Sequence, residues 1–150
     1  MSNRLFGVAS GRRRGGAALV VSAAAILMLA VPVTAASPVQ IATDPFTQAT
    51  CHASSTTNHQ ANVEPDSFSN GSTIVATYQV GRVFDGGACA IGFSTSTNNG
   101  ASWTRGLLPG ITKWVGSGPN DRATDASVAY DARHNAWLIS SLTLREDRRP

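Results

Sequence analysis

The sequence predicts an all-β fold of antiparallel strands, and three observations lead to that prediction. After residue 36 the chain is rich in Ser, Thr, Asn and Gly and poor in Lys, Glu and Leu, a composition that disfavours helices and suits short strands. Turn signals recur between β-branched and aromatic stretches, at Asn70-Gly71, Asp85-Gly86-Gly87 and Asn98-Asn99-Gly100. No stretch after residue 36 has the apolar periodicity of a helix.

The strands are expected in a regular succession once an irregular lead-in, residues 37–63, has passed. That lead-in keeps no apolar period, and we expect only a short strand in it, near Val39 to Ile41. Residues 106–121 hold two prolines and four glycines and are expected to form a loop. The predicted strands cover residues 64–69, 72–80, 88–95, 102–105, 126–131 and 136–144.

Two segments about sixty residues apart resemble each other. Residues 62–67 and 123–127 each precede a strand, a turn and a second strand, and each carries an acidic residue near its head, Glu64 and Asp125. Repetition of a four-stranded sheet is typical of the blades of a β-propeller. We therefore predict a first blade over about residues 64–105 and an incomplete second blade over about residues 123–144.

The N-terminus has the three parts of a secretory signal peptide: a basic start, an apolar middle and a small-residue end. We predict a signal-peptide helix in residues 1–36, cleavage after Ala35 or Ala36, and a secreted, extracellular protein. An uncleaved membrane anchor is disfavoured, because the apolar run from Ala17 to Val33 is shorter than the roughly 20 residues that span a bilayer. Arg13-Arg14 leaves open the choice between general secretion and the twin-arginine route.

Removal of the signal changes the charge of the protein. The whole chain has 12 Lys and Arg against 9 Asp and Glu, but four of the arginines precede residue 15. The remaining chain is close to neutral, so the sequence gives no support for nucleic-acid binding. We also expect no stable membrane association after signal cleavage.

Cys51 and Cys89 are the two cysteines of the chain. In an oxidising compartment two cysteines usually pair, and a bridge over a loop of this length would stabilise the fold by roughly 3–4 kcal/mol. The alternative is a metal site that includes the neighbouring His52 and the nearby His59. No loop has a convincing ligand spacing, so we predict no metal or other cofactor and leave calcium binding by loop carboxylates open.

The most informative local pattern runs from Ser96 to Trp103, Ser-Thr-Asn-Asn-Gly-Ala-Ser-Trp. It resembles the Asp-box of bacterial neuraminidase repeats (BNR repeats), which reads Ser-x-Asp-x-Gly-x-Thr-Trp. Asn98 and Ser102 stand where that family has Asp and Thr, and both keep a short polar side chain. A side chain at 98 can bond the turn amides, Gly100 can take positive φ, and the Trp103 ring can pin the turn. We assign Ser96, Asn98, Gly100, Ser102 and Trp103 to a structural Asp-box.

The resemblance, which covers about residues 60–144, implies a secreted sialidase-like β-propeller, and many members of this family hydrolyse terminal sialic acid. Such an enzyme uses three arginines to clamp the substrate carboxylate, a Tyr–Glu nucleophile pair and an Asp acid/base. The Arg-Ile-Pro signature of the first clamp arginine is absent here. Arg82 and Asp85 are weak candidates for the catalytic set; a surface or packing role for Arg82 and a turn-forming role for Asp85 are the plainer interpretations.

Length limits the functional prediction. A blade takes about 40–60 residues and a closed propeller typically needs about 4–8 blades, whereas about one and a half to two are expected here. We therefore predict a truncated sialidase-like glycoside hydrolase without a complete active site, acting on a glycan or glycoconjugate. The alternative function is a non-catalytic extracellular β-repeat or glycan-binding module, and the alternative fold is a small β-sandwich that carries an Asp-box hairpin.

Overall fold

The regular structure in the described part of the chain is entirely β-strand. The computed structural model describes residues 37–54, 57–59 and 61–146. The predicted signal peptide, residues 1–36, and its cleavage position lie outside these residues. Among the described residues no helix has the length and apolar character needed to cross a bilayer. The strands are β1 (Thr57–Asn58), β2 (Val63–Asn70), β3 (Thr73–Val83), β4 (Ala88–Ser96), β5 (Thr104–Leu107), β6 (Arg122–Asp131) and β7 (Ala136–Leu144).

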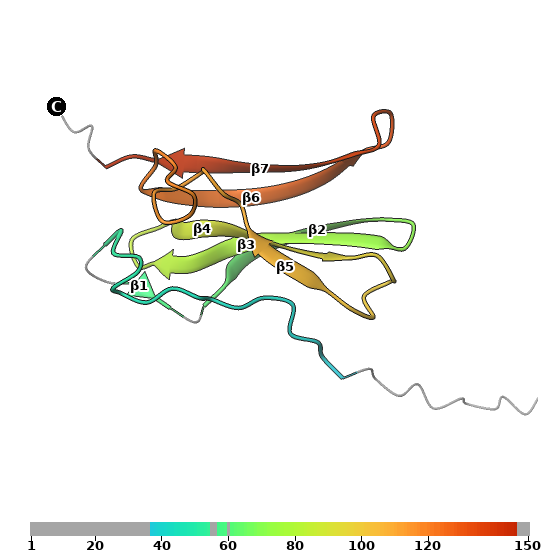
Figure 1. Ribbon diagram of the computed structural model, residues 1–150, viewed down its shortest axis with the longest axis horizontal. Coiled ribbons are helices and arrows are strands. Elements are labelled where there is room, and N and C mark those ends of the chain that lie inside the picture. Colours follow the sequence, from blue (N-terminus) through green and yellow to red (C-terminus); the bar gives the residue numbers. More distant parts are fainter. Residues whose placement is uncertain (1–36, 55–56, 60, 147–150) are drawn as a thin grey trace, which may run out of the picture. The chain divides into compact units, whose positions relative to one another are not determined.

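Strands β2 to β5 form a four-stranded antiparallel meander. β2 pairs with β3, β3 with β4 and β4 with β5, each antiparallel to its neighbour in sequence (Figure 1). Two short turns close the first two hairpins, and the predicted turn residues lie in both of them. The all-β, antiparallel prediction is confirmed, because every pairing between these strands is antiparallel.

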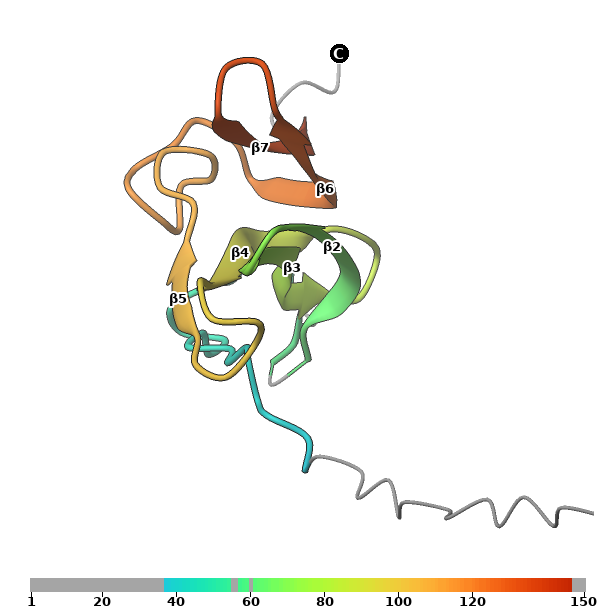
Figure 2. The same cartoon turned by 90° about the vertical axis from the view of Figure 1, so that its right-hand side faces the viewer.

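The β6–β7 hairpin is the second substructure. Its strands pair antiparallel over most of their length, and a single position, Ala123 opposite Ala88, joins it to β4. Figures 1 and 2 show the hairpin lying over one face of the β2–β3–β4 sheet rather than extending that sheet in its plane. Short β1 pairs with the far end of β3, where Thr57 is opposite Val83. The central strands are therefore covered rather than exposed.

Both faces of the central strands are buried. Residues 75–81 of β3 are buried without interruption, which is expected of a strand that is covered on both sides. On one face the lead-in and the loop after β5 pack against the sheet around Phe46, Tyr78 and Val80. On the other face Ile91 of β4 packs with Ala123 and Ala126 of β6. Two separate apolar clusters thus hold the lead-in and the β6–β7 hairpin to the same pair of strands.

Residues 37–54 of the lead-in cross the sheet without pairing with it, so the short strand predicted near Val39 to Ile41 is wrong. Side chains of the sheet hold it instead. Both the Ser94 and the Tyr78 hydroxyls donate to the Ile41 carbonyl, the latter over 3.4 Å, and the two hydroxyls are 2.7 Å apart. Cys51 and Cys89 form the predicted disulfide, with their Cα atoms 6.1 Å apart and both residues fully buried.

β2 and β6 share an irregularity at corresponding places. The pairing register shifts between Val63 and Asp66 in β2 and between Thr124 and Ser127 in β6. In each bulge an acidic residue has positive φ, Glu64 at 52° and Asp125 at 51°. These are the two residues that the sequence comparison placed at the head of each repeat. The two segments therefore share an irregular backbone conformation, in which positive φ is uncommon outside Gly, Asn and Asp.

Asp66 links the two substructures. Its Oδ2 accepts hydrogen bonds from the Ser127 hydroxyl and the Val128 amide of β6, both over 2.8 Å. The Val128 amide bond is the main cause of a pKa below the ordinary aspartate value, and the Ser127 bond adds to it. A carboxylate that accepts such bonds is stabilised in its charged form. The ionised side chain therefore helps to hold β6 against β2.

Gly81 lies under the disulfide and offers a test of this packing. It has φ of 72°, and a Cβ atom there would lie 2.8–2.9 Å from Phe46 and Cys89. Gly71 has φ of 58° with no atom near the Cβ position, so it matches the backbone strain without the clash. We expect Gly81→Ala to destabilise the protein by about 1–3 kcal/mol more than Gly71→Ala, measured by urea unfolding. Equal losses would contradict the close packing.

The Asp66 contact predicts a pH effect. Because its pKa is lower in the folded than in the unfolded state, Asp66 stabilises the fold fully above the unfolded pKa of about 3.9 and loses this contribution as the pH falls through the folded pKa. Urea unfolding of Asp66→Asn should show lower stability than wild type at neutral pH and a smaller difference at acidic pH. Asp125→Asn controls for the lost charge; a difference independent of pH would count against this role.

Candidate functional site

A polar pocket lies at the end of the sheet where β3 turns into β4 and where β6 begins. Its volume is about 460 Å³, and it is lined by Ala53, Ser54, Asp85, Arg122, Leu144 and Glu146. These residues come from the lead-in, the β3–β4 turn, the first residue of β6 and the end of β7. The pocket is within the size range of small-molecule sites, and most of its lining surface is polar. It is the strongest candidate site in the described part of the chain.

Arg122 is the centre of this pocket. Its side chain is only 9% exposed, and both terminal nitrogens bind Asp85, Nη1 to Oδ1 over 2.8 Å and Nη2 to Oδ2 over 3.3 Å. Nη1 also donates to the Gly86 carbonyl, and Nη2 forms an ion pair with Glu146. This bidentate arrangement is the strong form of an arginine–carboxylate contact. The guanidinium therefore fixes the positions of both carboxylates.

The two carboxylates face solvent while their arginine does not. Asp85 is 58% exposed and Glu146 is 50% exposed. The hydrogen bond from Arg122 is the main cause that holds the pKa of Asp85 below its usual value, so this carboxylate stays ionised well into the acidic range. The accessible surface of the pocket is consequently rich in hydrogen-bond acceptors. Such a surface suits a ligand that carries several hydroxyl or amine donors.

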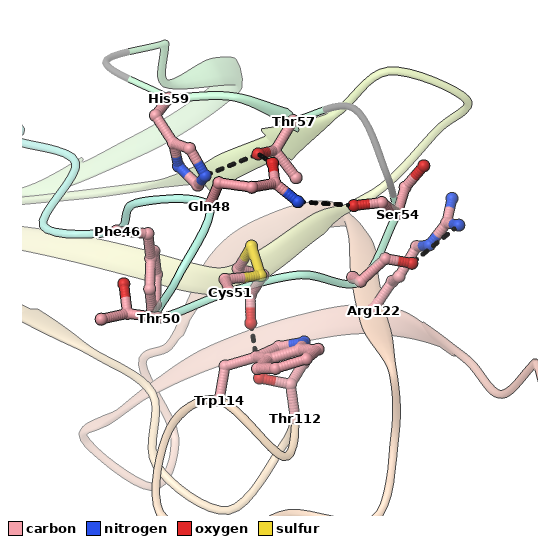
Figure 3. The surroundings of a disulfide bond; sticks show 12 residues. Phe46, Gln48, Thr50, Cys51, Ser54, Thr57, His59, Thr112, Trp114 and Arg122 are labelled. Carbon is pink, nitrogen blue, oxygen red and sulfur yellow. Dashed lines mark hydrogen bonds between the residues drawn. A yellow bond between two sulfur atoms is a disulfide. The ribbon is translucent and has the colours of Figure 1, made fainter.

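The disulfide positions the lead-in side of the pocket. Cys51 is bonded to Cys89 of β4, and Ala53 follows two residues later, where its carbonyl accepts a hydrogen bond from Nη2 of Arg122 over 3.3 Å. Figure 3 shows Ser54 and Arg122 near one another on one side of the bridge, with Trp114 and Thr112 on another side. Thr112 donates its hydroxyl to the Cys89 carbonyl. The bridge thus attaches the lead-in residues beside Arg122 to β4, and Thr112 attaches the loop after β5 to the same strand.

The carboxyl end of β7 is fastened to the same place by Asp121. The Asp121 amide donates to the Leu144 carbonyl over 2.8 Å, and its Oδ2 accepts from the Glu146 amide over 3.0 Å. The bond from the Lys113 ammonium is the main cause that lowers the pKa of Asp121, and the Glu146 amide adds to it. Glu146 therefore reaches Arg122 from a backbone that Asp121 holds in place.

The two residues proposed from the sequence do not meet. Arg82 is half-buried near the end of β3, where it pairs across the sheet with Ala88, and its side chain forms no ion pair with Asp85 among the described residues. Asp85 lies in the pocket, but its partner is Arg122, which sequence reasoning did not select. Arg122 carries no local motif, and the sequence predicted that the strand begins only at residue 126, whereas β6 begins at Arg122. Only folding shows that it is buried beside Asp85.

The Ser96–Trp103 turn lies at the opposite end of β4. Asn98 Oδ1 accepts from the Ser102 amide and the Ser96 hydroxyl, each over 2.9 Å. The Ser96 hydroxyl oxygen accepts from the Gly100 amide over 2.8 Å, and Trp103 Nε1 donates to the Gly100 carbonyl over 3.0 Å. Gly100 has φ of 87°. The five residues singled out in the sequence therefore form one hydrogen-bonded turn, which is remote from the pocket.

Comparison with known proteins adds no family. No protein-family model matches the sequence, and neither the curated proteins nor the solved structures contain a match.

The described residues do not converge into a metal site. No group of three or more His, Cys, Asp or Glu side chains among residues 37–54, 57–59 and 61–146 is arranged to hold an ion. His52 lies on the surface with its ring 4.8 Å from the Trp114 ring, whereas His59 lies 3.4 Å from Asp44. The two histidines thus have separate surroundings. What the pocket offers is hydrogen bonding by carboxylates around one buried guanidinium.

Replacing Arg122 tests whether the pocket depends on it. We expect Arg122→Gln to destabilise the fold by about 1–3 kcal/mol, because it removes charge-assisted hydrogen bonds to two carboxylates and two carbonyls. Urea unfolding measures this loss, and NMR titration should show the pKa of Asp85 rising in the variant. Arg82→Gln is the matched control, expected to leave the Asp85 titration unchanged. An unchanged titration in Arg122→Gln would refute the assignment.

Proposed function

We propose that this chain is a secreted, sialidase-like β-propeller protein that recognises extracellular glycans. In this proposal β2 to β5 are the four strands of one blade, and the β6–β7 hairpin begins the next. The observation that carries it is the Ser96–Trp103 turn, which joins the third and fourth strands of the meander and makes the hydrogen bonds expected of an Asp-box. The matching bulges at Glu64 and Asp125 support a repeated unit.

The pocket around Arg122 is the proposed place of glycan contact. It lies at the end of β4 opposite the Asp-box turn, about 30 Å away for a nine-residue strand. The exposed carboxylates of Asp85 and Glu146 are suited to accept hydrogen bonds from sugar hydroxyls. The rigid attachment of both to Arg122 reduces the entropy that a ligand must overcome on binding.

Binding without hydrolysis is the activity that this pocket supports. The family resemblance implies three arginines around a substrate carboxylate, whereas among the described residues Arg122 is the one arginine lining the pocket, and two carboxylates already bind it. The described lining of the pocket also holds no Tyr–Glu pair. A bound sugar would therefore meet acceptors rather than a nucleophile.

A glycan array tests the proposal. The full-length product, secreted and fluorescently labelled, should retain a restricted set of glycans, and Asp85→Asn should weaken that binding several-fold. Asp131→Asn is the matched control, because it removes the same charge at the far end of β6. A fluorogenic sialoside should not be turned over. Absence of glycan binding by a protein that circular dichroism shows to be folded would overturn the proposal, and turnover would refute the claim of binding without hydrolysis.

A further inference from the structure

The chain contains two Asn-Gly pairs in neighbouring turns, and the backbone nitrogens of their glycines differ in hydrogen bonding. Asn70-Gly71 lies in the turn between β2 and β3, and Asn99-Gly100 lies in the turn between β4 and β5. The Asn99 amide donates to the carbonyl of Ser72 over 2.9 Å, so the two turns touch. Asparagine is a thermolabile residue, because its side chain can deamidate. In that reaction the backbone nitrogen of the next residue attacks the side-chain carbonyl carbon, so the next residue governs the rate.

The Gly100 nitrogen is held. Its N–H donates to the Ser96 hydroxyl oxygen over 2.8 Å, and Ser96 is itself fixed by donation to Asn98. Gly100 is half-buried, and the Trp103 ring lies 3.7 Å from where its Cβ would be. Attack by this nitrogen would require loss of the hydrogen bond and movement of the whole turn.

The Gly71 nitrogen has no such restraint. Among the described residues Gly71 donates its amide to no backbone or side-chain acceptor. Both Asn70 and Gly71 are exposed, and no atom lies within 4 Å of the Cβ position of Gly71. Open space around Gly71 and the wide range of dihedral angles that glycine allows let its nitrogen approach the side chain of the preceding residue.

We propose that Asn70 is a site of spontaneous deamidation and that the Asp-box hydrogen bonds protect Asn99 from the same reaction. The Gly71 nitrogen, having lost its proton to base, attacks Cγ of Asn70. A bond forms between that nitrogen and Cγ, the bond from Cγ to Nδ2 breaks, and ammonia leaves with a proton from water. Water then opens the resulting succinimide at either carbonyl, which yields aspartate or isoaspartate at position 70.

The product alters a turn that has little room for change. Asn70 pairs with Thr73, so only Gly71 and Ser72 form the connection between β2 and β3. Isoaspartate adds one carbon to the backbone within this two-residue turn, and register in a hairpin depends on turn length. Aspartate adds a negative charge two residues before Ser72, whose carbonyl accepts the Asn99 backbone amide. Ageing of the secreted protein would therefore act on the β2–β3 hairpin first.

The experiment follows both sites in one sample. The full-length protein is incubated at mildly alkaline pH and at body temperature, and peptide mapping by mass spectrometry measures the conversion of Asn70 and of Asn99 over time. We expect conversion at Asn70 to be several-fold faster than at Asn99, and faster still at higher pH. In concentrated urea the two rates should become similar, because both nitrogens are then free.

Two results would overturn the proposal. One is equal conversion at both sites in the folded protein; the other is a preference for Asn70 that persists unchanged in urea, which would assign the preference to local sequence alone. Ser96→Ala removes the acceptor of the Gly100 amide and should accelerate conversion at Asn99 several-fold. If circular dichroism shows that this variant is folded and the Asn99 rate is unchanged, Ser96 does not protect it. The urea comparison decides the proposal even where the variant fails to fold.

Discussion

The disulfide between Cys51 and Cys89 is the constraint on which the rest of the described structure depends. The lead-in has no strand pairing of its own before β1, so the covalent attachment to β4, together with the hydrogen bonds to Ile41, keeps it across the sheet. Its Phe46 packs on the buried centre of β3, and its residues Ala53 and Ser54 lie beside Arg122. In the chain-entropy model, a disulfide stabilises a protein mainly by restricting the unfolded chain. Here it lowers the conformational entropy that the lead-in loses when it becomes ordered.

The contact between the β2–β5 meander and the β6–β7 hairpin is non-covalent. A single β-bridge joins the β6–β7 hairpin to β4, and the remaining attachment is apolar packing around Ile91 together with the bonds to Asp66. Packing of one sheet face against another tolerates small shifts, whereas a carboxylate that accepts two hydrogen bonds from one short segment does not. Asp66 therefore sets the register of β6 over β2, and the apolar cluster supplies most of the attraction.

Local chemistry predicted a large part of this fold. The strand positions could be predicted because β-branched runs and Asn-Gly or Gly-Gly turns depend on only a few consecutive residues. The Ser96–Trp103 turn likewise depends on only eight. The resemblance between residues 62–67 and 123–127 singled out Glu64 and Asp125, and the structure adds that both lie in bulges with positive φ. The strand expected near Val39 was wrong, because an extended apolar segment becomes a strand only where a free sheet edge is available, and here the lead-in crosses a face.

The candidate site shows the limit of that reasoning. Asp85 was selectable because it lies in a Gly-rich turn, but Arg122, 37 residues away, has no motif around it. Pairing the two requires the β3–β4 turn, the start of β6 and the end of β7 to meet, and no local rule encodes such a meeting.

By itself the sequence determined the all-β character, the turns and the pairing of two cysteines, because these follow from backbone preferences and from the presence of only two thiols. Only the tertiary structure decided which arginine is buried, which carboxylates face solvent and which Asn-Gly amide is free. These depend on distances between segments that are far apart in the chain, and on solvent exclusion, which exists only once the segments have packed.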